Sequence, residues 1–410
     1  MKRGTIISIV ALLAIAGCLV LATAGCGGSA SPTPTATVTV TATPSATASP
    51  SPTASGSVQT KTQLVVACAS GSRLNAVSAI SSSGQVKQLV PPSGAAIRDL
   101  AWSPDGRRLA YLQQASSQSE AAFLRIYDAD SGTVSTVDFP SLGTGSKAPI
   151  QAVLGLSWVG ATQLLAANAT TSATYRTNGL LWLCDVTAAP GTEKSVKDVG
   201  GRAVKGAFPS AATDATLVAF VSYGHKASNS IPEKLQAYNA DTLSVKTVAT
   251  ASQVADIDGD PFQYPLISPD GSLIAAAQTG SDPGFGVTVY PVDGSAPIKG
   301  GHYVWPTPMS WSFDGRLAFA GAPGNADWQA STVWVWKPGS GKPAKIIAPT
   351  KYPITSLAWS PKASQIAYAV GRDNGLTSDL WVVGADGGNP HLLLAKAGWP
   401  AWAQAPISFP

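Results

Sequence analysis

Few residues of this chain have the types and spacing that catalysis requires. Its 410 residues include only three histidines, His225, His302 and His391, which lie far apart in the sequence. The sequence contains no Gly-x-Ser-x-Gly motif, no His-Glu-x-x-His motif, no phosphate-binding loop and no cysteine pair at zinc-binding spacing. We therefore predict no catalytic residue, no metal and no cofactor, and we interpret each histidine as an ordinary loop residue.

Two acidic patterns could be mistaken for functional carboxylates. The segment 256–260, Asp-Ile-Asp-Gly-Asp, resembles the start of a calcium loop, in which alternate carboxylates offer oxygens to a hard cation. Ile267 stands where such a loop needs its glutamate, so a solvated turn is the favoured interpretation. Asp105, Asp270 and Asp314 each precede a glycine, and aspartate in such turns bonds to nearby backbone. We interpret these three as structural.

Aromatic residues followed by proline form the pattern that favours a binding site. They precede the expected opening strand of four consecutive sequence repeats and are Tyr264-Pro265, Trp305-Pro306, Tyr352-Pro353 and Trp399-Pro400. Loops expected on the same face contain Trp328 and Arg372. Rigid rings bury much area at small entropic cost, so Tyr264, Trp305, Tyr352, Trp399, Trp328 and Arg372 together predict a platform for a peptide, glycan or protein. The alternative is that these rings only fill space between repeats.

The elements that must position these residues are internal repeats. Leu100-Ala101-Trp102-Ser103-Pro104-Asp105-Gly106 is the clearest copy, and related segments begin at Leu357, Pro308 and Leu266, with weaker copies around Trp158 and Phe208 and a truncated one at Trp402. The copies recur about every 50 residues, a period typical of four-stranded propeller blades. Their tryptophans are interpreted as packing between neighbouring blades.

The two ends of the repeat region complement each other. Residues 63–90 supply strands without an opening tryptophan copy, whereas residues 397–404 supply an opening copy without later strands. Joining them completes one blade and removes exposed sheet edges. The predicted fold is all-β, a seven-bladed β-propeller closed by both termini over residues 62–410.

The repeat resembles the WD40-like Ser-Pro-Asp-Gly repeats of the TolB family over residues 62–405. The chain is also similar to the propeller part of actinobacterial LpqB-type lipoproteins, but it lacks the extra domain expected before the propeller. These resemblances imply an extracytoplasmic propeller and specify no activity.

The N-terminus predicts the compartment. Lys2 and Arg3 precede an apolar run and small residues before Cys26, which resembles a lipoprotein signal. We predict a signal peptide over residues 1–25, lipid attachment at Cys26, and a disordered Ser/Thr/Pro-rich linker over residues 26–61. Cys18 is the alternative lipidation site, and an uncleaved anchor is the alternative to cleavage. Each version places the remainder outside the cytoplasm, tethered to the cell membrane.

The composition limits the kinds of partner that this chain is expected to bind. With 27 basic and 23 acidic residues, 12% of the chain is charged. The basic residues form no dense cluster, so we do not expect the chain to bind nucleic acid. Cys68 and Cys184 are expected to be buried free thiols, because a complete blade separates them. We expect a monomeric, non-catalytic binding or scaffold module for a protein or cell-wall ligand. The alternatives are an enzyme acting on a glycan or ester, and a sensor or accessory subunit of an envelope system.

Overall fold

The computed structural model describes residues 62–63, 65–81, 83–114, 122–137, 152–169, 178–188, 194–213, 216–223, 230–254, 262–277, 286–304, 308–323, 330–372, 377–404 and 407–408. The predicted signal peptide 1–25, Cys26 and the linker 26–61 lie outside this part of the chain. All regular elements among the described residues are strands, so the predicted all-β class is confirmed.

The strands are short and follow the sequence repeats. The first half of the chain forms β1 (Thr62–Gln63), β2 (Val65–Ser70), β3 (Ala76–Ser81), β4 (Val86–Val90), β5 (Ile97–Trp102), β6 (Arg108–Gln114), β7 (Ala122–Asp128), β8 (Val134–Thr136), β9 (Ala152–Trp158), β10 (Gln163–Ala169), β11 (Gly179–Asp185), β12 (Lys194–Ser195), β13 (Lys205–Ala211), β14 (Leu217–Tyr223), β15 (Ser230–Asn239) and β16 (Ser244–Val254). The second half forms β17 (Gln263–Ile267), β18 (Leu273–Ala277), β19 (Gly286–Pro291), β20 (Ile298–Val304), β21 (Met309–Trp311), β22 (Leu317–Pro323), β23 (Thr332–Trp336), β24 (Ala344–Lys345), β25 (Ile354–Trp359), β26 (Gln365–Gly371), β27 (Ser378–Gly384), β28 (His391–Leu394), β29 (Ala397–Trp402) and β30 (Ile407–Ser408).

Neighbouring strands pair into antiparallel units. Units β5-β6-β7-β8 and β25-β26-β27-β28 are separate four-stranded sheets. The units β9 to β12 and β13 to β16 are joined into one larger sheet because β11 also pairs with β13, and pairing of β20 with β22 likewise joins β17 to β20 with β21 to β24. Each unit therefore corresponds to one copy of the sequence repeat.

One sheet combines the two ends of the chain. Its order is β29-β2-β3-β4, and in it Val66 lies opposite Trp402 and Ala67 lies opposite Ala401. The expected pairing of residues near 65 with residues near 400 is therefore present.

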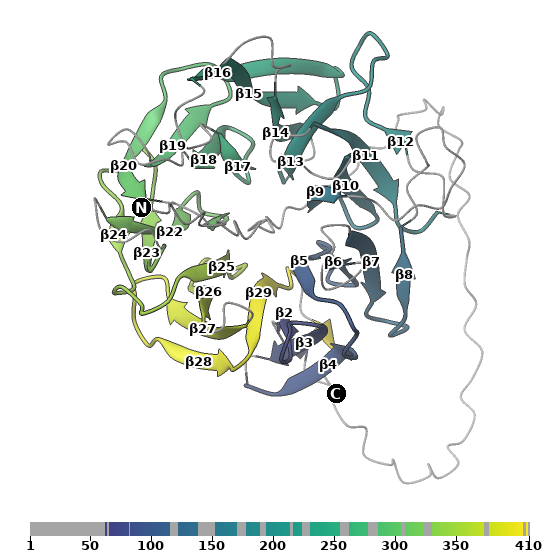
Figure 1. Ribbon diagram of the computed structural model, residues 1–410, viewed down its shortest axis with the longest axis vertical. Helices are drawn as coiled ribbons and strands as arrows, with labels where there is room; N and C mark the ends of the chain where they lie inside the picture. Colours follow the sequence, from purple (N-terminus) through teal and green to yellow (C-terminus); the bar gives the residue numbers. More distant parts are fainter. Residues whose placement is uncertain are drawn as a thin grey trace, which may run out of the picture.

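Figure 1 shows these units arranged around a common centre, with β5, β9, β13, β17, β25 and β29 nearest to it. Most residues of these first strands are buried; β5 and β25 are examples, each with five buried residues of six. The hydrophobic core lies between neighbouring units, as where Ala67 of β2, Leu100 of β5 and Ala401 of β29 share one cluster.

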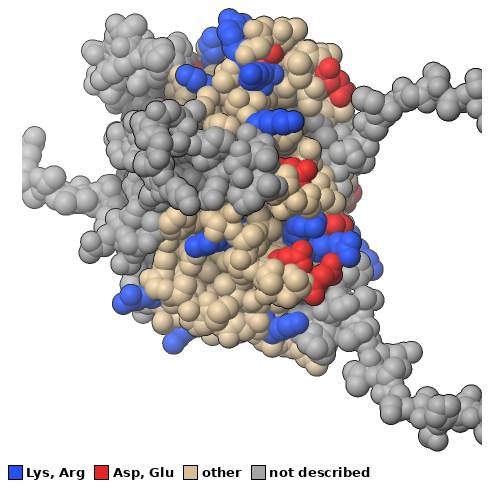
Figure 2. All heavy atoms as spheres, turned by 90° about the vertical axis from the view of Figure 1, so that its right-hand side faces the viewer, with Lys and Arg blue, Asp and Glu red and all other residues tan. Residues whose placement is uncertain are grey.

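The exterior is sparsely charged. On the side shown in Figure 2, Lys and Arg side chains are scattered among Asp and Glu, and most of the described surface carries neither. Short apolar strands joined by Gly, Ser and Thr turns account for this composition.

Candidate functional site

The first strand of each unit has two ends that differ in chemistry. We call its start the leading end, and the end at which it turns into the second strand the turn end. At the turn end of β5, Ser103 Oγ donates to Asp105 Oδ1 at 2.6 Å, and the Arg108 backbone N–H donates to Ser103 Oγ at 2.9 Å. Ser312 Oγ bonds to Asp314 Oδ1 in the same way at 2.5 Å. The structural interpretation of these aspartates is therefore confirmed.

The pKa of Asp314 shows the effect of these bonds. Burial by itself raises it, but hydrogen bonds from Arg316 and Ser312 outweigh burial and lower the pKa from its ordinary value. A carboxylate held in this way stays ionised and is a turn element, not a proton donor.

Three tryptophans each tie a unit to the one before it. Trp158 Nε1 donates to the Ala101 carbonyl at 2.8 Å, and Trp311 Nε1 donates to the Leu266 carbonyl at 2.9 Å. Trp402 Nε1 makes the same kind of bond to the Ala358 carbonyl at 3.2 Å. The predicted packing role of the repeated tryptophans is confirmed by these bonds between first strands of adjacent units.

At the leading end the first strands carry β-bulges. Asp99, Phe208, Tyr264 and Trp399 have φ angles of 54°, 53°, 48° and 56°, and each lies where the pairing register with the second strand shifts. This left-handed region costs a non-glycine residue about 1–2 kcal/mol, and it is unusual for an aromatic side chain. Four strands thus hold the same strained conformation at the same place.

Residues at this position contact one another from unit to unit. The Trp399 backbone N–H donates to Ser356 Oγ at 3.0 Å, and the rings of Phe208 and Tyr264 meet edge to face with centroids 4.7 Å apart. A side chain on Gly155, at the corresponding place in β9, would lie 3.2 Å from Phe208 Cα. Because these residues lie on the strands nearest the centre in Figure 1, we call the group Asp99, Gly155, Phe208, Tyr264, Ser356 and Trp399 the axial collar.

The axial collar contains two of the predicted site residues. Tyr264 and Trp399 are half-buried collar members. The expectation that their aromatic-Pro pairs precede the opening strand is wrong, because Tyr264 lies within β17 and Trp399 within β29. The bulge explains the difference, since proline cannot donate a ladder hydrogen bond and is tolerated in a strand at such a point.

Of the other predicted site residues, Tyr352 and Arg372 do not join the collar. Tyr352 precedes β25, and its ring lies 4.8 Å from Lys351 Nζ. Arg372 Nε pairs with Asp379 Oδ1 at 2.9 Å, and that oxygen also accepts the Lys396 backbone N–H at 3.0 Å. Arg372 therefore pairs within the β26–β27 hairpin, and Asp379 links that hairpin to the turn before β29. Trp305 and Trp328 lie outside the described residues, as does segment 256–260.

Phe208 was assigned the wrong place in the repeat. The sequence pattern assigns Phe208 to the position that Trp102 occupies in its own repeat. In the structure, Ala211 of β13 occupies that position. The Ala211 N–H bonds to Ser157 Oγ of the preceding unit at 3.3 Å, just as the Trp359 N–H of β25 bonds to Ser310 Oγ of β21 at 3.3 Å. Phe208-Pro209 is itself an aromatic-Pro pair, so the signal that indicated Tyr264 also fits Phe208.

Arg98 and Asp99 form a charged pair at the collar that the sequence analysis did not single out. Arg98 Nε lies 3.7 Å from Asp99 Oδ2, and their side chains are 14% and 3% exposed. Neither Asp99 oxygen has a hydrogen-bond donor among the described residues. Burial raises the pKa of Asp99 to about 7, against the opposing effect of Arg98. No repeat motif marks this pair, because only its burial makes it unusual.

Histidine and cysteine add no cluster to the collar. His391 is exposed, with Nδ1 2.9 Å from the Asn389 carbonyl; His302 lies in β20, and His225 is outside the described residues. Within the described ranges, no group of three or more His, Cys, Asp or Glu could hold a metal ion. Cys68 and Cys184 are buried free thiols, as predicted, and burial raises the pKa of Cys68 to about 12. None of the described segments is a helix long and apolar enough to span a membrane.

Comparison with known proteins identifies the fold. An oligogalacturonate lyase in complex with manganese superposes with a TM-score of 0.54 at 14% identity, covering 81% of this chain and 85% of that one. A mutant puromycin hydrolase superposes with a TM-score of 0.53 at 13% identity, covering 82% of this chain and 52% of that one. Taken with the antiparallel four-stranded units, these matches define the class of the protein as a β-propeller, and identities this low show the fold alone.

The expected likeness to TolB is weaker. A putative TolB from Agrobacterium tumefaciens has a TM-score of 0.42 at 12% identity, covering 82% of this chain and 91% of that one. We draw no conclusion about this chain from a TM-score this low. No protein-family model matches the chain, and no curated protein matches it in sequence.

Proposed function

We propose that this propeller is a non-catalytic binding module and that the axial collar is its contact surface for a protein or cell-wall ligand. The carrying observation is that Asp99, Phe208, Tyr264 and Trp399 all occupy the left-handed region at the leading end of a first strand. Backbone strain persists only where the surroundings enforce it, and it concentrates at functional sites. Phe208, Tyr264 and Trp399 are also only partly buried, so a ligand can reach them.

The chemistry of the collar favours binding over hydrolysis. Enzymes that hydrolyse glycans generally use a pair of carboxyl groups that flank the bond to be cleaved. Asp99 is the single carboxyl group of the collar, and its side chain is only 3% exposed. The aromatic rings of the collar suit recognition of an apolar or ring-shaped group.

The finer architecture is part of the proposal. We infer seven blades, with the last closed by β29 pairing to β2, and a monomer in solution. The assignment of four strands to each repeat copy and the sheet β29-β2-β3-β4, which combines the two ends of the chain, support this count.

The location is likewise proposed from the sequence. A signal peptide over 1–25, lipid at Cys26 and a linker over 26–61 would tether the propeller to the extracytoplasmic face of the membrane, and similarity to the propeller part of LpqB-type lipoproteins supports this. Feeding cells an alkyne fatty acid should label the chain and its Cys18→Ser variant, whereas Cys26→Ser should lose the label. Retention of label by Cys26→Ser and its loss in Cys18→Ser would move the lipid to Cys18.

Binding is tested by removing the collar rings. We expect the double variant Tyr264→Asn/Trp399→Asn to lose at least about tenfold in affinity for isolated cell-wall sacculi or for a cross-linked envelope protein. Asparagine tolerates positive φ, so the backbone conformation is kept. Co-sedimentation and cross-linking report the two ligand classes separately.

Phe313→Ala is the matched control. Phe313 is 45% exposed and lies in the turn after β21, at the opposite end of the first strands. It should leave binding unchanged. Equal binding by the collar variant, with a thermal unfolding midpoint like that of the parent chain, would overturn the proposal.

A further inference from the structure

Two arginines of this chain fasten a unit to the next one at the turn end. Arg108 Nη1 donates to the Ala161 carbonyl at 3.2 Å, and Arg316 Nη2 donates to the Ala363 carbonyl at 2.7 Å. The Arg316 guanidinium also lies 4.8 Å from the centre of the Trp359 ring. Each guanidinium therefore fills the space between two units and bonds to a turn carbonyl of the neighbour.

Leu217 stands at the same register position in the unit β13 to β16. Arg108 immediately precedes Leu109, which pairs with Trp102; Leu217 immediately precedes Val218, which pairs with Ala211. Leucine is shorter than arginine and has no donor to reach across the boundary. This boundary thus lacks the bridge that Arg108 and Arg316 make elsewhere.

The neighbour across this boundary supplies the matching carbonyl position. The Ala363 N–H bonds to the Ser360 carbonyl at 2.9 Å, and the Gly271 N–H bonds to the Ser268 carbonyl at 2.9 Å in the equivalent turn. Ala363 and Gly271 both have positive φ, 52° and 74°. The Gly271 carbonyl therefore corresponds to the carbonyl that Arg316 binds in its own neighbour.

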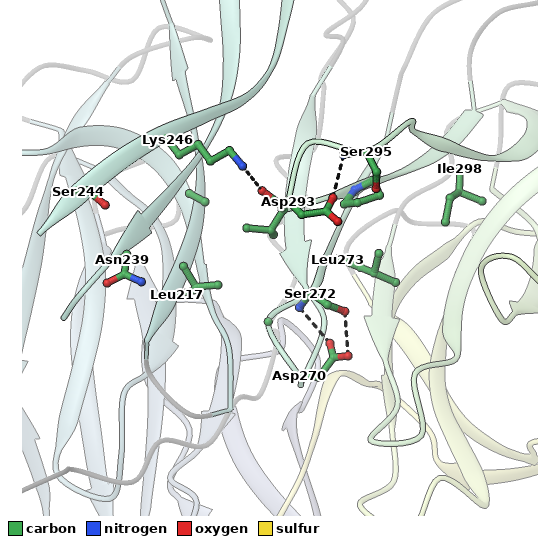
Figure 3. Close-up of a pocket in the computed structure, with 14 residues that line it drawn as sticks. Leu217, Asn239, Ser244, Lys246, Asp270, Ser272, Leu273, Asp293, Ser295 and Ile298 are labelled. Carbon is green, nitrogen blue, oxygen red and sulfur yellow. Dashed lines mark hydrogen bonds between the residues drawn. The ribbon is translucent and has the colours of Figure 1, made fainter. Parts of the chain in front are cut away.

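A cavity of about 740 Å³ occupies this boundary, within the size range of ligand pockets. Leu217, Gly271 and Leu273 are among the residues that line it. In Figure 3, Lys246 and Asp293 lie toward one end of it and Asp270 and Ser272 toward the other, with Leu217 and Leu273 between them.

The lining favours a cation. Of its charged side chains, Lys246 is positive, and Asp270 and Asp293 are negative. Lys246 Nζ donates to the Val292 carbonyl at 2.6 Å and lies near Asp293, so its charge is offset locally. Hydrogen bonds from Ser295 lower the pKa of Asp293, and those from Ser268 and Ser272 oppose burial and lower the pKa of Asp270. Both carboxylates are therefore ionised near neutral pH.

We propose that this cavity is a binding site for an arginine side chain presented by a partner peptide. The incoming guanidinium takes the place that Arg108 and Arg316 occupy at their own boundaries, donating to the Gly271 carbonyl and lying at the end of the cavity that holds the Asp270 carboxylate. The apolar stem of the arginine packs on Leu217 and Leu273. The site lies at the turn end, so it is distinct from the axial collar and does not depend on the collar being a binding surface.

The first test compares two peptides with the full chain by calorimetry. We use acetyl-Gly-Arg-Gly-amide and the same peptide with citrulline, which keeps the shape of arginine but has no charge. The arginine peptide should bind at least about tenfold more tightly, since charge-assisted hydrogen bonds are the stronger kind. Equal affinity of the two peptides, or no binding of either at millimolar concentration, would overturn the proposal.

The second test lets the protein fill its own site. The substitution Leu217→Arg restores the bridge found at Arg108 and Arg316, so it should raise the thermal unfolding midpoint and abolish binding of the arginine peptide. Val245→Arg is the control, because Val245 is 37% exposed in β16 and adds the same charge close by without lining the cavity. Undiminished peptide binding by Leu217→Arg, or equal loss in both variants, would contradict the assignment.

Discussion

The two ends of the first strands follow opposite rules. At the turn end, Ser103 and Asp105 repeat the bonds of Ser312 and Asp314, and every one of these polar groups has a partner. At the leading end, Asp99 has no hydrogen-bond donor among the described residues and shares its strained backbone conformation with aromatic residues of other units. One end repeats its chemistry, and the other repeats only its backbone shape.

This difference indicates that the turn end contributes mainly to stability and the leading end mainly to recognition. Bonds that recur in unit after unit, such as those of Trp158 and Trp311, hold neighbouring units together. Side chains that differ at a common strained position, as Asp99, Phe208 and Trp399 do, give each unit its own contact chemistry. Substitutions at the turn end should therefore act mainly on stability, whereas those at the leading end should act on binding or on its pH dependence.

The largest effect is expected from Trp158→Ala. Trp158 is fully buried and donates to the Ala101 carbonyl, so its removal leaves a cavity and breaks a hydrogen bond between two units. We expect the free energy of unfolding to fall by about 3–5 kcal/mol, measured by urea denaturation. Leu392→Ala, at a side chain 47% exposed, is the control and should change it little. A Trp158→Ala chain as stable as the parent would refute the proposed role of these cross-unit bonds.

The next effect is a pH dependence confined to the leading end. The folded-state pKa of Asp99 is about 7, above its ordinary value of 3.8, so the folded chain holds this proton more tightly. The stability that protonated Asp99 contributes is present at low pH and is lost as pH rises from about 4 to about 7. The free energy of unfolding falls by at most about 4 kcal/mol over this range. Asp99→Asn should remove that loss, so its stability relative to the parent should increase over this range in denaturation measured at each pH.

Asp314→Asn provides the contrast from the turn end. Folding lowers the pKa of Asp314, so the ionised carboxylate stabilises the folded chain. That stabilisation is present above the pKa of Asp314 in the unfolded chain and is lost as pH falls through its pKa in the folded chain. Its variant should lose stability relative to the parent near neutral pH and match it more closely in acid. Parallel pH profiles for the two variants would show that the two ends do not differ in this way.

The smallest expected effect is the difference in stability between alanine substitutions of two arginines at the turn end. Arg316→Ala removes the bond to the Ala363 carbonyl and the contact with Trp359, and should cost about 1–3 kcal/mol in the free energy of unfolding. Arg107→Ala removes only an ion pair with Asp130 in which both side chains are 62% exposed, and should cost less than about 0.5 kcal/mol. Chemical denaturation of both variants measures the difference, and equal costs would remove the special role of the cross-unit arginine.

Much of the fold was predictable because its signals are local. The Trp-Ser-Pro-Asp-Gly segment at 102–106 contains its own turn, and its recurrence indicates the repeated four-stranded unit. The interpretation of Asp105 and Asp314 as turn residues was confirmed for the same reason, since their hydrogen-bond partners lie within a few residues. The pairing of β29 with β2 was predictable because each end of the repeat region lacked what the other supplied.

The candidate site was predictable only in part. Tyr264 and Trp399 were found through their prolines, but Phe208 was placed three residues out of register because a bulge shifts the strand without changing the sequence pattern. Asp99 gave no signal at all, because an aspartate in a strand looks alike whether it is buried or exposed. The cavity beside Leu217 was equally hidden, since it results from a missing arginine at a contact between units.

The sequence by itself determined the repeat, the turn chemistry and the all-β class, because hydrophobic periodicity and Ser-Pro-Asp-Gly turns act over short stretches of chain. Only the tertiary structure decided which residues share the axial collar, that Arg98 and Asp99 form a buried pair, and that Leu217 stands where two other units place a bridging arginine. Those properties depend on strands from different repeats meeting at particular registers, and register is set by packing between neighbouring units.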